Sequence, residues 1–326
     1  VQATSYAFAA ILADGSVITW GSEISGGDSR AAQDRLKNVH CIQSTRSAFA
    51  AIVADGSIVA WGNPCLGGDS GAVQDQLAKA KEIQSTARAF AAILADGSVA
   101  TWGDGHYGGD SRAVQGQLKS VQQIQSNVHA FAAILADGSV VTWGQSPDGG
   151  DSTAVQGRLK NVKQIQSTLR AFAAILEDGS VVTWGDANTG GNSRTVQNRL
   201  KNVQQIQSTD HAFAAVLMDG SVVTWGSAGS GGDSRAVQDR LKNVRDTQST
   251  KDAFAAVLAD GSIVTWGNAR HGGDSRAVQR RLKNVKEVQR TCRAFAAIVG
   301  DGSVVTWGEH DCGGDSSAVQ GLLSSA

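Results

Sequence analysis

Hydrophobic and polar positions recur along this chain with a fixed spacing of 41 residues. Tryptophan stands at positions 20, 61, 102, 143, 184, 225, 266 and 307, always followed by glycine. Phenylalanine keeps the same step from Phe8 to Phe295. A period of this length is typical of repeat proteins in which each repeat forms one supersecondary unit. Eight such repeats need 328 residues, and the sequence has 326.

One repeat, "CIQSTRSAFAAIVADGSIVAWG" (41–62), has the pattern of three short strands. We expect strands at 42–45, 48–53 and 57–62, with a tight hairpin at the Asp-Gly pair between the second and third. The second and third strands are apolar on both faces, which is typical of sheets that pack between neighbours. The repeat therefore predicts one small antiparallel sheet.

The remainder of the repeat, "GGDSGAVQDQL" (67–77), favours a short helix. Asp69 or Ser70 is suited to cap it, and Val73 and Leu77 then share one face. An extended fourth strand is the alternative for this segment. The glutamine that recurs here, such as Gln74, is expected to hydrogen-bond backbone between neighbouring units.

A period near 41 residues also fits helical repeats, but those need two or three amphipathic helices per unit, and this repeat has room for at most one. The pattern therefore predicts an all-β fold, a closed eight-bladed β-propeller with short helices between blades. In the repeat alignment Ala326 matches Val39 and Val1 matches Ile42, so the two ends nearly meet. We therefore expect residues 1–326 to form a single domain.

The stretch "VKQIQSTLRAFAAILEDGSVVTWGDANTGG" (162–191) resembles the repeat of the regulator-of-chromosome-condensation superfamily. That superfamily includes a bacterial propeller that inhibits β-lactamases, and the resemblance implies the propeller fold along the whole chain. This chain departs from the family at Ala48, where the family often has histidine, in "GGDS" for "G-Q-L-G", and in having eight repeats. The family's nucleotide-exchange activity is not carried over, because its loops have no match here.

Charge and cysteine content narrow the partners and the setting. The net charge is −1, which gives no electrostatic case for nucleic acid or a membrane surface. The apolar runs are far shorter than a membrane-spanning helix. The four cysteines lack the spacing of a zinc site, although Cys292 and Cys312 are expected to approach each other. A reducing, cytoplasmic setting is favoured over a disulfide.

No repeated residue forms a catalytic pattern. Asp14 and its equivalents belong to the hairpin turns, and Asp28 and its equivalents are expected to cap or form turns. The six histidines have no metal-ligand spacing, and neither a phosphate-binding loop nor a nucleophile elbow occurs. The sequence therefore predicts no catalytic residue, metal or cofactor, and no enzyme activity.

Sequence variation among the repeats is concentrated in two windows. One is the pair of residues before "AF", such as Arg46-Ser47, and the other is the quartet after "WG", such as residues 63–66. Alternate connections of an antiparallel meander emerge at the same edge, so both windows are expected on one face and the uniform Asp-Gly turns on the other. Binding residues tend to lie on loops carried by a rigid scaffold.

These windows supply the candidate binding residues. The pairs carry five cations against two anions and the quartets six anions against one cation, so a basic inner ring and an acidic outer ring are expected if the first strand is innermost. Such a face suits a polar protein or peptide partner. The candidates are Tyr6, Glu23, Arg46, Leu66, Arg88, His106, Tyr107, His129, Asp148, Arg170, His211, Lys251, Arg270, His271, Arg293 and His310.

The sequence thus favours a monomeric, non-enzymatic scaffold that binds a protein or peptide partner, with no nucleic acid or membrane partner. Four alternatives remain open: variation by neutral drift, an engineered or recently amplified array without a ligand, a lectin-like or small-ligand binder, and a regulator resembling an exchange factor. A lectin-like site requires the same side chains in every repeat, which the variable windows lack.

Overall fold

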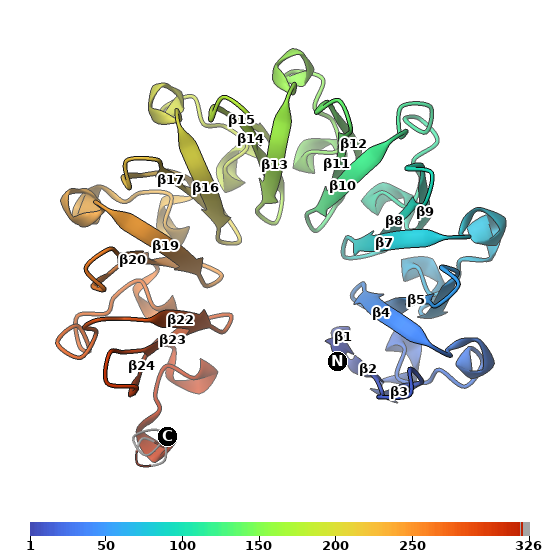
Figure 1. Cartoon of the computed structure of the whole chain (residues 1–326), viewed down its shortest axis with the longest axis horizontal. Coiled ribbons are helices and arrows are strands. Elements are labelled where there is room, and N and C mark those ends of the chain that lie inside the picture. Colours follow the sequence, from blue (N-terminus) through green and yellow to red (C-terminus); the bar gives the residue numbers. More distant parts are fainter. Residues whose placement is uncertain (320, 322–326) are drawn as a thin grey trace. The chain divides into compact units, whose positions relative to one another are not determined.

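The computed structural model of the chain describes residues 1–319 and 321. Within these residues the chain forms eight antiparallel sheets of three strands, with strand orders that run from β1-β2-β3 to β22-β23-β24 (Figure 1). Each sheet comes from one repeat, and we call the sheets blades 1 to 8 in chain order. The all-β, eight-bladed β-propeller class predicted from the repeat is thereby confirmed.

Every blade has the same succession of strands. In blades 1 to 4 they are β1 (Gln2–Ala3), β2 (Ala7–Ile11), β3 (Val17–Gly21), β4 (Val39–Ser44), β5 (Ala48–Val53), β6 (Ile58–Gly62), β7 (Ala80–Ser85), β8 (Ala89–Leu94), β9 (Val99–Gly103), β10 (Val121–Ser126), β11 (Ala130–Leu135) and β12 (Val140–Gly144). In blades 5 to 8 they are β13 (Val162–Ser167), β14 (Ala171–Leu176), β15 (Val181–Gly185), β16 (Val203–Ser208), β17 (Ala212–Leu217), β18 (Val222–Gly226), β19 (Val244–Ser249), β20 (Ala253–Leu258), β21 (Ile263–Gly267), β22 (Glu287–Arg290), β23 (Ala294–Ile298) and β24 (Val304–Gly308).

Short 3₁₀ helices occupy the connections that follow the third strands. They are η1 (Glu23–Ser25), η2 (Gln33–Arg35), η3 (Pro64–Leu66), η4 (Gly71–Gln76), η5 (Gly105–Tyr107), η6 (Ser146–Asp148), η7 (Gln156–Arg158), η8 (Ala187–Thr189), η9 (Gln197–Arg199), η10 (Ala228–Ser230), η11 (Arg235–Arg240), η12 (Ala269–His271), η13 (His310–Cys312) and η14 (Ser317–Val319). The variable quartets coincide with the first helix of each connection.

The chain divides into two compact units, Val1–Ile165 and Gln166–Ala326, and the boundary falls within β13. Blades 1 to 4 belong to the first unit, and blades 6 to 8 to the second. Each unit is described by itself below. The closed ring and the single domain stay predictions.

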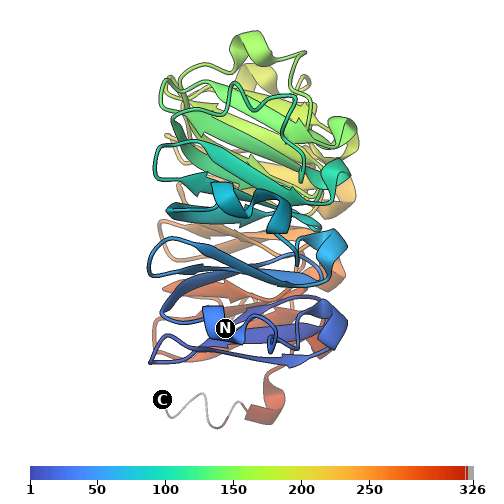
Figure 2. The same cartoon turned by 90° about the vertical axis from the view of Figure 1, so that its right-hand side faces the viewer.

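Blade-to-blade packing buries the middle strands. In the first unit, coloured blue to green, the sheets lie face to face (Figure 2), and every residue of β5 is buried. Phe49 stacks on Trp61 with ring centroids 5.2 Å apart, and the Trp61 indole Nε1 donates a hydrogen bond of 3.1 Å to the Gly26 carbonyl of blade 1. Trp102 and Trp143 in the first unit and Trp225, Trp266 and Trp307 in the second make the same bond to the preceding blade, which explains the strict period of the aromatic pair.

Two consecutive glycines follow each quartet, and in blade 1 close contacts require both. Gly26 has φ +91°, and a Cβ placed on it lies 2.6 Å from the Phe49 ring of the next blade. A Cβ on Gly27 lies 2.5 Å from the main chain of Gly21. No other residue fits either place without moving its neighbours, so the "GG" sequence belongs to the blade interface.

The Asp-Gly turns are the expected hairpins. In blade 1 the Asp14 carboxylate accepts hydrogen bonds from the backbone N–H and the hydroxyl of Ser16, at 2.9 and 2.6 Å. These bonds lower the pKa of Asp14, because they stabilise its ionised form. The structural role predicted for this aspartate is confirmed.

The segment after "GGDS" contains the predicted short helix, as a 3₁₀ helix, in six repeats, whereas in blades 3 and 7 it is a turn; in none of the described residues is it a fourth strand. In blade 2 the Asp69 carboxylate accepts from the Gly71 N–H at 2.8 Å, so it holds the turn that starts η4. Ser70 donates to the Gln74 side chain at 3.0 Å instead of capping the helix. Leu77 is buried between blades 2 and 3.

The prediction that the recurring glutamine links neighbouring blades is wrong. The Gln74 amide donates to the carbonyl of Ile58, at the start of the third strand of its own blade, at 3.3 Å. Gln33 and Gln115 make the same bond to Val17 and Val99. The outer strand of a sheet has unpaired backbone groups, and this amide satisfies one of them, so it protects an edge strand.

The outward aromatic face of blade 1 has no preceding blade in the first unit. Phe8 and Trp20 are each 45% exposed, whereas Phe49 and Trp61 of blade 2 are 0% and 4% exposed. The Phe8–Trp20 pair keeps the stacked geometry of the other blades, at 5.3 Å. The geometry of the aromatic pair is therefore set within one blade, and only its burial depends on a neighbour.

Candidate functional site

The two variable windows of one blade lie side by side. In blade 3 the N–H of Asp104, the first quartet residue, donates to the carbonyl of Arg88, the second pair residue, at 3.0 Å. The hydroxyl of Thr86 donates to the carbonyl of Tyr107 at the other end of the quartet, also at 3.0 Å. In the second unit the N–H of Asp186 makes the same bond to Arg170, at 2.9 Å.

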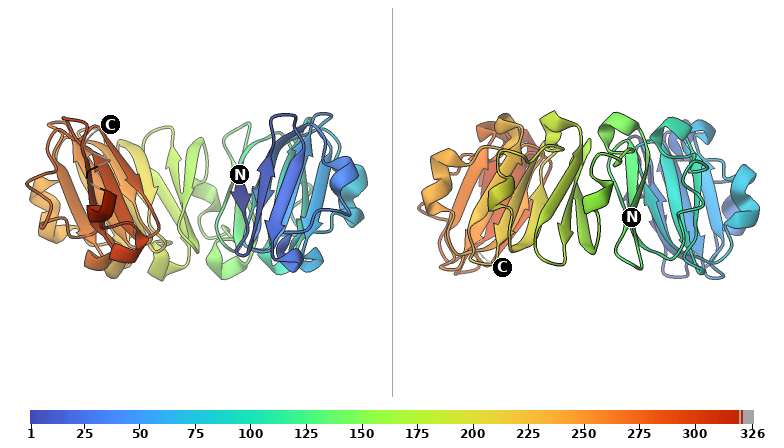
Figure 3. Two further views of the ribbon diagram at one scale, coloured as in Figure 1. Left: turned by 90° about the horizontal axis from the view of Figure 1, so that it is seen from below. Right: turned by 90° about the horizontal axis from the view of Figure 1, so that it is seen from above.

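Within each unit, the prediction that both windows share one face is therefore confirmed. In the first unit the quartet helices lie at one edge of the blades and the hairpin turns at the opposite edge (Figure 3). We call the surface formed by the pairs and the quartets the variable face.

Backbone hydrogen bonds also connect the pairs of successive blades. Arg46 donates its N–H to the carbonyl of Ala87 at 2.9 Å, and Ala87 donates to Val128 at 3.0 Å. In the second unit Asp210 donates to Lys251 at 2.8 Å. These bonds use no side chain, so the side chains of the pairs are free to vary while the backbone of the variable face stays fixed.

Each quartet presents its residues in the same order. In blade 3 the Asp104 carboxylate accepts from the His106 N–H at 3.0 Å and caps η5, while Gly105 and His106 are exposed at its tip. Tyr107, the fourth residue, turns back toward the blade and is half-buried. In seven of the eight quartets only the two central residues are fully exposed, whereas in blade 4 the first residue, Gln145, is exposed as well.

A cluster of variable side chains links blades 3 and 4 in the first unit. The Arg88 guanidinium lies 4.7 Å from the centroid of the Tyr107 ring and 3.6 Å from the Asp104 carboxylate. The ring of Tyr107 packs against His129 of blade 4 with centroids 5.0 Å apart. His129 Nδ1 lies 2.7 Å from the carboxylate of Asp148, which is only 4% exposed. These variable residues contact one another and have defined positions.

A second cluster links blades 6, 7 and 8 in the second unit. The Asp252 carboxylate accepts from the Ser230 hydroxyl at 2.7 Å and lies 3.0 Å from His271 Nδ1. His271 Nε2 lies 3.5 Å from the Glu309 carboxylate, which is also 3.3 Å from Arg293. The imidazole is thus placed between two carboxylates.

One carboxyl group of the variable face has an upward-shifted pKa. Burial raises the pKa of Asp210, and the nearby positive charges of Lys251 and His211 oppose this shift. The hydrogen bond to Asp311 and the charge of Asp315 raise the pKa of His310, which lies at an exposed quartet tip. The pKa of Asp210 and the pKa of His310 thus both depend on charged side chains nearby.

The predicted binding residues differ in accessibility. Those exposed on the variable face are Tyr6, Glu23, Arg46, His106, Arg170, Lys251, Arg270, Arg293 and His310. Those half-buried in contacts between loops are Leu66, Arg88, Tyr107, His129, His211 and His271, and Asp148 is buried. Asp148 is therefore a positioning residue for His129 rather than a surface contact.

Sequence reasoning did not select Asp104, Asp252 and Glu309, although they organise both clusters. A signal was present for Asp104. The first quartet position is Ser, Asn, Asp, Gln or Glu in the eight repeats, and Ser, Asn and Asp are typical helix caps. The contact of Glu309 with His271 joins blades 8 and 7, and that of Asp252 with His271 joins the two windows of blade 7 across 19 residues, so no local pattern in the sequence indicates them.

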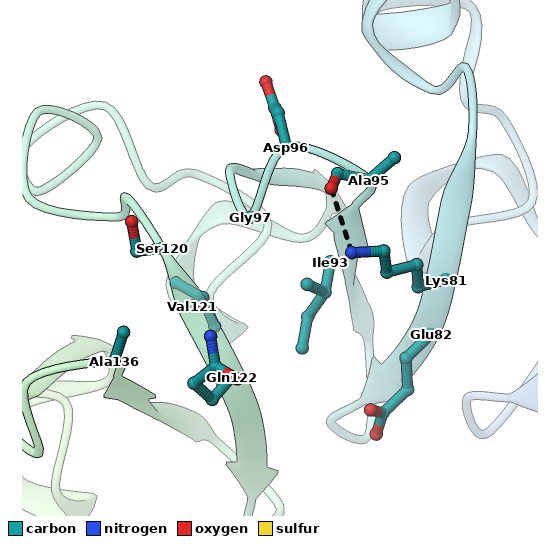
Figure 4. A pocket seen from close by; sticks show the side chains of 10 residues that line it. All are labelled: Lys81, Glu82, Ile93, Ala95, Asp96, Gly97, Ser120, Val121, Gln122 and Ala136. Carbon is teal, nitrogen blue, oxygen red and sulfur yellow. Dashed lines mark hydrogen bonds between the residues drawn. The ribbon is translucent and has the colours of Figure 1, made fainter.

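A cavity of about 430 Å³ lies away from the variable face, between β7 and β10 beside an Asp-Gly turn (Figure 4). Its Lys81 ammonium donates to the Ala95 carbonyl at 2.9 Å, and its Glu82 carboxylate accepts from Gln84 at 2.7 Å. The Asp96 carboxylate accepts from its own turn. Its charged groups are thus engaged with the protein, and we assign no ligand to it.

In the part of the chain that the structure describes, no helix has the length and apolar composition needed to cross a membrane. Among the same residues, no three His, Cys, Asp or Glu side chains gather as ligands for a metal ion. The reducing, cytoplasmic setting stays a prediction.

The sheet topology is that of a β-propeller, and each unit has the variable loops at one edge of its blades. No family model matches the chain, and no curated protein matches it. Similar solved structures include Prp20p from Saccharomyces cerevisiae, at 16% identity and a TM-score of 0.43 over 73% of each chain. The CRINKLY WD40 ectodomain of the Arabidopsis thaliana receptor kinase ACR4 has 13% identity and a TM-score of 0.42, over 81% of this chain and 93% of that one. The computationally designed Ika8 protein has 12% identity and a TM-score of 0.38 over 85% of each chain.

Proposed function

We propose that the chain is a non-enzymatic scaffold that binds a protein or peptide partner on its variable face. The observation that carries this proposal is the separation of two kinds of residue. The bonds that fix the face come from backbone groups and from repeated residues such as Thr86, while the side chains between them differ in every repeat. A fixed backbone with variable side chains is the usual design of a recognition surface.

The distribution of unpaired charge favours an acidic partner segment. Carboxylates of the variable face are largely used within it, as Asp104, Asp148 and Glu309 illustrate. Three exposed cations, Arg46, Arg170 and Lys251, have no ion pair of 4 Å or less with any described residue. Complementary charge steers association and selects partners, so a segment rich in Asp or Glu is the chemistry these cations fit.

A charge-matched pair of triple variants tests the proposal. The first replaces Arg46, Arg170 and Lys251 with glutamate. The second replaces three exposed lysines outside the variable windows with glutamate, Lys37, Lys201 and Lys242. Both change the net charge equally, and neither removes an ion pair between described residues.

The measurement is quantitative affinity capture with the wild-type chain and both variants, followed by titration of acidic and basic peptides of equal length. We expect the variable-face variant to lose the captured partner and the acidic peptides, and the control to keep them. Equal loss with both variants, or loss with the control alone, rejects the variable face as the binding surface. Circular dichroism and the unfolding midpoint verify that both variants fold.

Four finer statements belong to the same proposal. We infer a monomer in a reducing, cytoplasmic setting, with no nucleic-acid or membrane partner. Membership of the regulator-of-chromosome-condensation superfamily is supported by the repeat motif quoted above. Sedimentation at several concentrations tests the monomer directly.

A further inference from the structure

Blade 8 brings two cysteines together on its variable face. Cys292 is the first residue of the pair before β23, and Cys312 is the last residue of the quartet helix η13. The Thr291 hydroxyl donates to the Cys312 carbonyl at 2.8 Å, and the Lys251 N–H donates to the Cys292 carbonyl at 2.9 Å. Repeated backbone contacts of the blade therefore set the positions of both cysteines.

The two side chains are free thiols on neighbouring backbone segments. Cys292 is exposed and Cys312 half-buried. The bonds of the Thr291 hydroxyl to the Cys312 carbonyl and of the Glu309 N–H to the Arg293 carbonyl hold the residues on both sides of Cys292 against η13. The other two cysteines belong to the first unit: Cys41 is half-buried in β4, and Cys65 is exposed at the tip of η3. The chain thus carries one adjacent thiol pair and an exposed single thiol for comparison.

The thiol pair is a special feature of blade 8 and not a part of the repeat. The same two positions hold Ala87 and Tyr107 in blade 3, and Val128 and Asp148 in blade 4. The repeat therefore brings these two positions together in other blades too, whereas two cysteines occupy them in blade 8 alone.

We propose that Cys292 and Cys312 form a thiol-modification site, which a small disulfide oxidant of the glutathione type converts into an intrachain disulfide. The Cys292 thiolate attacks the oxidant, whose S–S bond breaks, and a mixed disulfide forms as one glutathione thiolate leaves. The Cys312 thiolate then attacks the Cys292 sulfur and displaces the second glutathione. Two cysteine thiols lose two electrons and two protons, and the oxidant becomes two glutathione thiols.

The order of the two steps follows from the surroundings of each thiol. Partial burial, the neighbouring Cys292 side chain and the negative charge of Glu309 raise the pKa of Cys312. A thiol reacts as its thiolate, so Cys312 is the poorer first nucleophile. The more exposed Cys292 meets the oxidant first, and Cys312 acts as the resolving thiol.

The experiment treats the full chain with oxidised glutathione and maps its peptides without reduction. We expect an intrachain Cys292–Cys312 link, while Cys65 stops at the mixed disulfide. Because resolution at Cys292 is intramolecular, its mixed disulfide is expected at an occupancy at least about tenfold lower than that of Cys65. The C312S variant is expected to restore a stable mixed disulfide at Cys292, and C65S to leave the link unchanged.

Persistent mixed disulfides on both Cys292 and Cys312, or a link between two chains, overturn the proposal. So does oxidation of C312S without accumulation of the Cys292 adduct. Circular dichroism confirms that each variant folds. The result is independent of whether the variable face binds a partner, because no partner is present in the assay.

Discussion

Thr247 offers a sharp test of how the repeat stabilises its blades. It lies in β19 at a position that is isoleucine in five blades, for example Ile83 and Ile206, and valine in blade 8. Thr247 is 0% exposed, and no described residue lies within hydrogen-bond distance of its hydroxyl. A polar group is therefore buried without a partner where neighbouring blades pack an aliphatic side chain.

The expected gain from T247V follows from this geometry. Valine has nearly the same shape as threonine, so the change removes the buried hydroxyl without creating a cavity. An unsatisfied buried polar group costs about 1–3 kcal/mol, so T247V is expected to raise the free energy of unfolding by about 1–2 kcal/mol. Relative to T247V, T247I buries one more methylene, which is expected to add about 0.8 kcal/mol to the free energy of unfolding if the site accepts the isoleucine that its counterparts hold.

The matched control is T265V in β21 of the same blade. Thr265 is also buried, but its hydroxyl donates to the Ser275 hydroxyl at 3.0 Å. The same substitution there removes a made hydrogen bond and is expected to lower stability by about 1 kcal/mol. The same Thr-to-Val change is thus expected to raise the free energy of unfolding at position 247 and to lower it at position 265.

Urea unfolding, followed by tryptophan fluorescence and circular dichroism, measures the free energy of unfolding of both variants. At roughly 2–4 °C per kcal/mol for a unit of this size, T247V is expected to raise the melting temperature by a few degrees. A lower stability of T247V, or equal effects of T247V and T265V, contradicts the assignment of Thr247 as an unsatisfied group. The reverse change I206T in blade 6 is expected to be destabilising.

Two further predictions concern a close contact and a titration. Gly67 has φ +97° and a Cβ there lies 2.6 Å from the Phe90 ring, so G67A is expected to lower stability by more than about 2 kcal/mol in urea unfolding, whereas G116A, with nothing within 4 Å, changes it by less than about 0.5 kcal/mol. The Arg235 side chain lowers the pKa of Asp233 to about 2, so NMR titration of R235Q is expected to show a rise toward 3.8. Because the folded pKa is the lower one, this contact stabilises the fold above pH 3.8 and is lost as the pH falls toward 2; an unchanged Asp233 titration in R235Q contradicts the pairing.

Much of the fold could be predicted because its determinants are local. The Asp14-Gly15 turn, the alternation of buried strands and the Trp-Gly ending each act within a few residues, and eight copies repeat them. The parity of an antiparallel meander then places both variable windows at one edge without any knowledge of distances. These predictions required only that each repeat form one sheet.

The rest of the candidate site depends on contacts that no local pattern encodes. Which residues of a quartet are open depends on the turn of the 3₁₀ helix, which exposes His106 and directs Tyr107 toward His129. Asp148 is part of a variable quartet, yet it is buried because His129 lies 2.7 Å away. The prediction for the recurring glutamine is wrong because the Gln74 amide donates to the carbonyl of Ile58, 16 residues earlier in the same blade.

Two residues differ from their counterparts in the other repeats, Asn127 beside the variable face and Thr247 in the core. Blade 4 has Asn127 where the other repeats have threonine. Its amide N–H still donates to the Asp148 carbonyl, and its side-chain oxygen accepts from the N–H groups of His129 and Ala130. It thus makes the same bonds as Thr86 in blade 3. Thr247, in contrast, leaves a buried hydroxyl unpaired. The chain tolerates a defect between blades but keeps the hydrogen bonds that fix its loops, which favours a function that depends on the geometry of the variable face.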